Sequence, residues 1–132
     1  MLEFLSNSFI DAEKYYKGSN LLEKHGIYYD KILVRGTLGS KIPDEYLFSL
    51  FNQSAERTLE LCKNIDDSKE IPVLLVHCTH GLNRTGLFIC NYLVKKCGMD
   101  PEEAIKLFEE ARGYSMKYDF FKNYIRSLSK SS

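Results

Sequence analysis

The chain has 132 residues, of which 44% are apolar, and its 18 basic and 18 acidic residues give a formal net charge of zero. This length and apolar content predict a single domain, residues 1–132, with one core. Zero net charge argues against a broad basic groove for long nucleic acid, so any RNA contact should be confined to an end of the strand.

No apolar run approaches the length of a membrane span, and the N-terminal MLEFLSNSFI lacks the basic and apolar regions of a secretory signal. The four cysteines, Cys62, Cys78, Cys90 and Cys97, form neither a CxxC pair nor a zinc spacing with the three histidines. We therefore expect an intracellular monomer without membrane contact, metal or cofactor. The sequence does not choose between nucleus and cytoplasm.

The first third of the chain predicts a strand followed by a helix. Residues 1–26 carry few signals, although Phe9 and Ile10 could end a strand and residues 11–16 form a helical turn. Residues 27–34 alternate as a strand does, residues 35–41 read as a loop, and Pro43 suits a first helical turn. The apolar positions of this helix should face the core: Leu47, Phe48, Phe51, Ala55, Leu59 and Cys62.

Asp44 has two interpretations at the start of this helix. It could be a general acid that protonates a leaving group, or an aspartate in a first turn, where the helix dipole favours negative charge. Both remain open, with Asp11 a more distant candidate acid. A tyrosine leaving group, with a pKa of about 10, needs the proton, whereas a diphosphate is far more acidic and needs it less.

The segment HCTHGLNRTG, residues 77–86, lies between a β-forming run and a helical stretch. Residues 71–76 are apolar and rich in β-branched side chains, as in a buried strand of a parallel sheet. Apolar residues between 87 and 94 recur at helical spacing up to Gly98, which should cap the helix. In this order the N–H groups of the loop and the positive end of the helix dipole converge and form an anion site.

The side chains of the segment indicate what happens to the anion. Cys78 faces the convergent positive field, which should lower the pKa of its thiol and favour the nucleophilic thiolate. Arg84 offers a planar pair of donors suited to two phosphoryl oxygens, and Thr85 can place its hydroxyl near the sulfur to stabilise it as a leaving group. Gly81 and Gly86 allow tight backbone and close approach.

The remaining residues of the segment should surround the bound phosphate. His77 is expected to orient the loop by hydrogen bonding, and the other expected contacts are Thr79, His80, Leu82 and Asn83. The alternative to a phosphate site is a buried cysteine with an unrelated arginine. In that case His, Cys, Arg, Thr and Gly would occur together by chance between a strand and a helix.

Two helices complete the chain. Asp100 and Pro101 predict the start of the first, with a cap and a proline at the first helical position, and Arg112-Gly113 its end. Its expected buried stripe is Ala104, Leu107, Phe108 and Ala111. The last helix, over 118–128, should pack through Phe121, Tyr124, Ile125 and Leu128. The alternation of strands and helices predicts an α/β fold with a mainly parallel central sheet, helices on both faces, and the loop at the carboxyl end of the central strand.

HCTHGLNRTG resembles the signature H-C-x5-R-[ST]-G of the cysteine-dependent phosphatases, and it is similar to the narrower form found in metal-independent RNA 5′-triphosphatases. These include capping-enzyme triphosphatase domains, RNA/RNP-complex phosphatases and baculoviral enzymes. Tyr15-Tyr16, residues 31–43 and residues 100–113 also resemble segments of this family. The resemblance implies a dual-specificity-phosphatase-like fold with a shortened N-terminus, since family members usually carry a further strand and helix there.

The resemblance further implies that the γ-phosphate, and in some enzymes also the β-phosphate, is removed from 5′-triphosphate RNA through a cysteinyl-phosphate intermediate. Arg112 would then reach the β- or γ-phosphate, the alternative being a surface arginine at a helix C-terminus. The resemblance leaves two arrangements open: the domain acts alone, or it acts beside a guanylyltransferase as its partner. Two other functions stay open: a protein tyrosine or dual-specificity phosphatase, and a non-catalytic phosphate-binding module, which the presence of both Cys78 and Arg84 disfavours.

Overall fold

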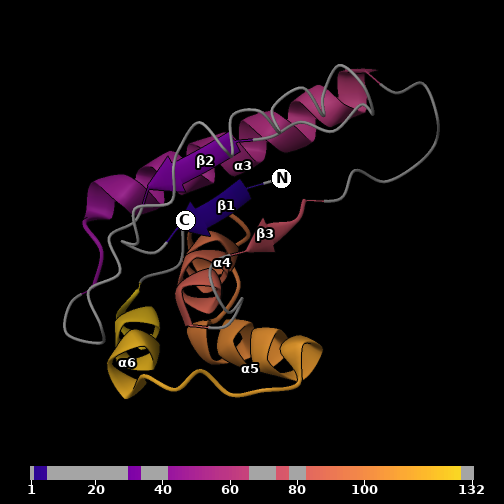
Figure 1. Cartoon of the computed structure of the whole chain (residues 1–132). Helices are drawn as coiled ribbons and strands as arrows, with labels where there is room; N and C mark the ends of the chain where they lie inside the picture. The colour runs from indigo at the N-terminus through magenta and orange to yellow at the C-terminus, as the bar shows by residue number, and fades with distance from the viewer. Residues whose placement is uncertain (1, 6–29, 34–41, 66–73, 78–82, 129–132) are drawn as a thin grey trace.

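A computed structural model of the chain describes residues 2–5, 30–33, 42–65, 74–77 and 83–128. In chain order, its strands are β1 (Leu2–Leu5), β2 (Asp30–Leu33) and β3 (Val76–His77). Its helices are α3 (Glu45–Ile65), which precedes β3, and then α4 (Asn83–Lys95), α5 (Pro101–Arg112) and α6 (Asp119–Ser127). Figure 1 shows the strands side by side, with α4, α5 and α6 grouped together below them in this view.

The described strands form a parallel sheet in the order β2-β1-β3. Leu2 pairs with Asp30 on one side of β1 and with Val76 on the other. A parallel sheet was expected, and β2 lies within the predicted strand at 27–34. The position of β1 was not expected: among the described strands it occupies the middle, whereas the sequence pattern favoured the strand before the loop as the central one. The predicted strand end at Phe9 and Ile10 lies outside the described residues.

Helix α3 begins two residues after Pro43, so this proline precedes the helix and is not part of its first turn. The backbone carbonyl of Asp44 accepts the first capping hydrogen bond, from the N–H of Leu47 at 2.9 Å. The inward face of α3 is as predicted for Phe48, Phe51 and Ala55, which are buried. The side chain of Cys62, predicted on the same face, lies outside the described part of the structure.

The ends of α4 and α5 follow the local sequence. Gly98 has the left-handed φ of 69° that favours glycine, and the N–H of the following Met99 returns to the carbonyl of Leu93 at 3.0 Å. At the start of α5, the carboxylate of Asp100 accepts the N–H of Glu102 at 3.2 Å, and Pro101 takes the first helical position. The bounds predicted for α5, a start at Asp100-Pro101 and an end at Arg112-Gly113, are confirmed.

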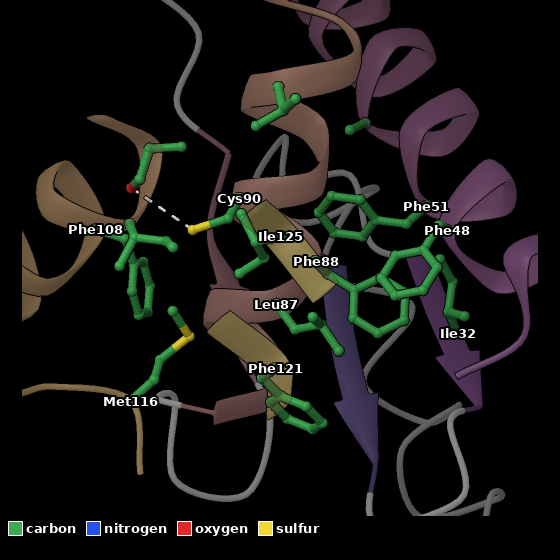
Figure 2. Packing of buried hydrophobic residues seen from close by; sticks show 14 residues of the cluster. Ile32, Phe48, Phe51, Leu87, Phe88, Cys90, Phe108, Met116, Phe121 and Ile125 are labelled. Carbon is green, nitrogen blue, oxygen red and sulfur yellow. Dashed lines mark hydrogen bonds between the residues drawn. The ribbon is translucent and has the colours of Figure 1, made fainter. Parts of the chain in front are cut away.

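Aromatic rings packed against one another join α3 to α4. Phe88 of α4 lies 4.5 Å from Phe48 and 5.5 Å from Phe51, measured between ring centroids. Figure 2 shows these three rings between the two helices, with Ile32 of β2 beside them. Tyr124 of α6 also stacks on Phe48, with 5.2 Å between the ring centroids. Helices α3 and α4 therefore cover one face of the sheet together, and the prediction of helices on the opposite face is not tested by the described residues.

The buried stripe of α5 differs from the prediction at two positions. Ala104 and Phe108 are buried as expected, but the third buried residue is Ile105. Leu107 is 50% exposed and Ala111 is exposed. Both stripes fit helical spacing, and the position of α4 decides between them, because α5 packs mainly against that helix. None of the described helices is both long enough and apolar enough to cross a membrane.

Candidate active site

The strand-to-helix order around the predicted phosphate loop is confirmed. Strand β3 ends at His77 and α4 begins at Asn83, so residues 78–82 connect a parallel strand to the N-terminus of a helix. The loop residues Cys78, Thr79, His80, Gly81 and Leu82 lie outside the described residues, as does the His77 side chain. Their predicted roles stay predictions, and the described part of the site consists of the first turn of α4 and what surrounds it.

Arg84 and Thr85 occupy this first turn, where helix N–H groups carry partial positive charge. Arg84 is half-buried and its Nη1 atom is shielded from solvent. Thr85 is buried, with 3% of its surface exposed. The first turn of α4 contains no acidic residue. A bound anion at this end of the helix would therefore meet an arginine and the positive end of the dipole, with no opposing carboxylate in that turn.

Gly86 allows α4 to approach the chain beyond it. A Cβ atom at this position would lie 2.6 Å from Cε1 of Phe108 and 2.7 Å from Sδ of Met116. Both distances are far inside van der Waals contact, so a larger residue fits only if the side chains of Phe108 and Met116 shift. The prediction that Gly86 allows a close approach is confirmed. The groups that approach it are the side chains of Phe108 and Met116.

The segment between α5 and α6 also reaches the first turn of α4. The backbone N–H of Lys117 donates to Oδ1 of Asn83 at 2.7 Å. The preceding N–H, of Met116, donates to Oε2 of Glu109 at 2.6 Å, and Nζ of Lys122 lies 3.1 Å from the same oxygen. Sequence reasoning missed this arrangement, because no local pattern indicates that residues 116 and 117 return to residue 83.

Asp44, the candidate general acid, lies at the start of α3 with an exposed side chain. Its neighbour Glu45 accepts a hydrogen bond from Oη of Tyr124 on α6 at 2.8 Å, which ties this end of α3 to the last helix. The position fits both interpretations of Asp44, as an acid or as a residue favoured by the helix dipole. The acid role stays a prediction, and the alternative Asp11 lies outside the described residues.

Arg112, the candidate contact for the β- or γ-phosphate, ends α5 and is exposed. Its guanidinium carbon lies 5.7 Å from the ring centroid of Tyr114, which is 65% exposed. This is a cation–π arrangement at the surface. The predicted phosphate contact of Arg112 is not tested by it.

Cys90 is a buried thiol and does not suit nucleophilic chemistry. Its Sγ atom lies 3.6 Å from the carbonyl oxygen of Ala104, to which it donates a weak hydrogen bond. Burial, with a smaller contribution from Glu109, raises the pKa of this thiol to about 12, so it stays protonated at neutral pH. Cys97, in contrast, is exposed. Among the described residues, no three His, Cys, Asp or Glu side chains are grouped as a metal site would require.

A parallel strand, a loop that begins with cysteine, and a helix whose first turn carries arginine and threonine together define the class of cysteine-dependent phosphatases. Comparison with known families agrees: the model of the dual specificity phosphatase catalytic domain matches residues 51–131, and the chain belongs to this family. The solved structure of a putative protein tyrosine phosphatase from Leishmania major superposes with a TM-score of 0.66 at 19% identity, covering 98% of this chain and 72% of that one. That likeness confirms the α/β fold.

Among sequences, the chain is 40% identical over 119 residues to the rat RNA/RNP complex-1-interacting phosphatase, covering 90% of this chain and 32% of that protein. It is 36% identical over 118 residues to a tyrosine-protein phosphatase of Autographa californica nuclear polyhedrosis virus, covering 89% and 62%. It is also 33% identical over 108 residues to the mouse mRNA-capping enzyme, covering 81% and 17%. The chain thus spans about a third of the rat relative's length.

Proposed function

We propose that the chain is an RNA 5′-triphosphatase that removes the γ-phosphate of 5′-triphosphate RNA. The observation that carries the proposal is the segment HCTHGLNRTG, which runs from the last residue of β3 into the first turn of α4. The names of two relatives, the RNA/RNP complex-1-interacting phosphatase and the mRNA-capping enzyme, support RNA as the substrate. The zero net charge suits recognition of an RNA end over recognition of a long strand.

In the proposed reaction, the thiolate of Cys78 attacks the γ-phosphorus and forms a sulfur–phosphorus bond as the bond to the β-phosphate oxygen breaks. Arg84 and the loop N–H groups stabilise the negative charge on the equatorial oxygens. Diphosphate-ended RNA departs with the electron pair of the broken bond. Water then attacks the cysteinyl-phosphate, releases inorganic phosphate and regenerates the thiolate. Asp44 is the proposed proton donor, a role that matters less for a diphosphate than for a tyrosine leaving group.

A labelled-substrate assay tests this proposal. The purified chain, in EDTA, is given γ-labelled and β-labelled triphosphate RNA in separate reactions, beside a phosphotyrosine peptide. We expect γ-label release to persist in the chelator and to exceed release from the peptide. Release of both labels would show that the enzyme trims the end to a monophosphate. Peptide dephosphorylation without γ release would contradict the proposal.

A second candidate is a protein tyrosine or dual-specificity phosphatase, which the name of the baculoviral relative, a tyrosine-protein phosphatase, favours. A tyrosine leaving group needs a proton, so this activity would depend on Asp44. A large loss of peptide dephosphorylation in Asp44→Asn, together with poor release from triphosphate RNA, would favour this candidate. Absence of release from every substrate would instead favour a phosphate-binding module without turnover.

A further inference from the structure

The first turn of α4 is held from outside at two points. Lys117 donates its backbone N–H to Oδ1 of Asn83 at 2.7 Å, and the buried side chain of Met116 lies directly against Gly86. Figure 2 shows Met116 next to Phe108. Because Asn83 and Gly86 flank Arg84 in the sequence, the two contacts bracket the arginine that should bind the phosphoryl group.

The segment that makes these contacts is itself fixed. Glu109 of α5 accepts the N–H of Met116 at 2.6 Å and pairs with Lys122 of α6 at 3.1 Å. The charged side chains of this pair are only 19% and 17% exposed, so solvent screens them less than a surface pair. The segment is therefore anchored to α5 and α6 independently of its contacts with α4, and it can serve as a support for that helix.

The hydrogen bond to Lys117 also determines the orientation of the Asn83 carboxamide. A backbone N–H can only donate, so the group that faces it must be the oxygen. Asn83 is the N-terminal residue of α4, where the connection from β3 ends. Its carboxamide thus ties the exit of the predicted phosphate loop to a support that belongs to neither β3 nor α4.

We propose that Asn83 is a positioning residue of the phosphatase reaction, whose hydrogen bond to the N–H of Lys117 fixes the direction in which Arg84 presents its donors. The proposal rests on the phosphatase chemistry of the family and does not depend on RNA as the substrate. The three equatorial oxygens become coplanar only in the transition state, where the planar donors of Arg84 must meet them, so loss of the correct direction lowers kcat more than it weakens substrate binding.

Two variants of similar size to asparagine test the proposal. Asn83→Leu removes the acceptor, whereas Asn83→Asp keeps an oxygen for the N–H of Lys117 and adds negative charge close to the anion. With p-nitrophenyl phosphate and inorganic triphosphate as substrates, we expect Asn83→Leu to lower kcat about tenfold or more, with little change in KM. Asn83→Asp should retain more of kcat and raise KM, because its charge repels the substrate. A kcat of Asn83→Leu within twofold of the parent, or a kcat of Asn83→Asp as low as that of Asn83→Leu, would overturn the proposal.

Removal of the donor provides an independent test should Asn83→Leu fail to fold. Lys117→Pro deletes the backbone N–H and leaves Asn83 in place. We expect it to lower kcat like Asn83→Leu, and the double variant to lose little more than either single variant, because both remove the same bond. Additive losses would contradict the proposal. Asn123→Ala is the matched control. This exposed asparagine of α6 also accepts one hydrogen bond, from Arg126 at 3.2 Å. Loss of that hydrogen bond should leave kcat unchanged.

Discussion

Gly86 occupies a position where even one methyl group is too large. Alanine there would place its Cβ against Phe108 and Met116 at 2.6 and 2.7 Å, and both neighbours are held in the core. We expect Gly86→Ala to lower the free energy of unfolding by about 1–3 kcal/mol, the usual cost of overpacking, as measured by urea denaturation. Ser115→Ala, at an exposed site in the same segment, is the control. Equal stability of Gly86→Ala and the parent would show that α5 moves away freely.

Cys78 is the residue on which the proposed chemistry depends. Cys78→Ser replaces a thiolate by a hydroxyl that stays protonated at neutral pH, so phosphate release should fall more than about a thousandfold. The circular dichroism spectrum and the thermal midpoint should stay close to those of the parent. Cys97→Ser is the control, since Cys97 is exposed at the end of α4 and should not affect turnover. Substantial phosphate release by the Cys78 variant would refute a cysteinyl-phosphate mechanism.

At the scale of secondary-structure elements, a chain of polar side chains crosses the interface of α3, α4 and α6. Asn52 donates from Nδ2 to Oδ1 of Asn91 at 3.1 Å, and Nδ2 of Asn91 donates to Oη of Tyr124 at 3.4 Å. The Tyr124 hydroxyl in turn donates to Glu45 at 2.8 Å. Because Asn91 is 1% exposed, water cannot replace it, and the chain of hydrogen bonds depends on this residue.

Asn91→Leu would keep the volume of the side chain and leave the buried Nδ2 of Asn52 without its acceptor. We expect it to lower the free energy of unfolding by about 1–3 kcal/mol, the cost of an unsatisfied buried polar group. Urea denaturation measures the loss, and Gln53→Ala, at an exposed position of α3, is the control. In Asn52→Leu/Asn91→Leu both amides are gone, so this double variant should be more stable than Asn91→Leu alone. The opposite order would contradict the role assigned to the pair.

The elements also show what local sequence can and cannot predict. The cap at Asp100, the proline at the first position and the left-handed Gly113 act within one turn, and they were read correctly from neighbouring residues. The buried face of α5 was read partly wrong, because Leu107 and Ile105 are both apolar and only the position of α4 selects between them. The contacts of residues 116 and 117 with α4 depend on tertiary packing alone.

At the scale of the whole molecule, the buried thiol of Cys90 couples stability to alkaline pH. Burial raises its pKa from 9.0 to about 12, so above pH 9 the unfolded chain loses this proton while the folded chain keeps it. The unfolded state then binds fewer protons, and stability falls as the pH rises from 9 towards 12. Each pH unit in that window lowers the free energy of unfolding by on the order of 1 kcal/mol.

We expect Cys90→Ala to be less stable than the parent at pH 8, because it leaves a small cavity, but to lose less stability between pH 8 and pH 10. Urea denaturation at a series of pH values measures both effects. Burial also raises the pKa of Tyr92 and of Tyr124, whose ordinary value is 10.0, so these two groups contribute chiefly at higher pH. An identical pH slope in the parent and in Cys90→Ala would exclude Cys90 as the source.

The fold class was predictable because the phosphate loop, its strand and its helix are consecutive in the sequence. The order of the sheet was not, since β1 is only four residues long, LEFL, and its neighbours come from distant parts of the chain. The same distinction holds for the site. Arg84, Thr85 and Gly86 are recognisable within one motif, whereas the support at Met116 and Lys117 becomes visible only when α5 and α6 are in place.

The position of β1 has a consequence for how the protein forms during synthesis. Its residues leave the ribosome before those of β2 and β3 and can pair with β2 early, but the other edge of β1 pairs with β3, which is made much later. Until Val76 and His77 emerge, a nascent chain carries an open strand edge, the kind of surface on which chains associate wrongly. Pairing across such a sequence separation also slows folding.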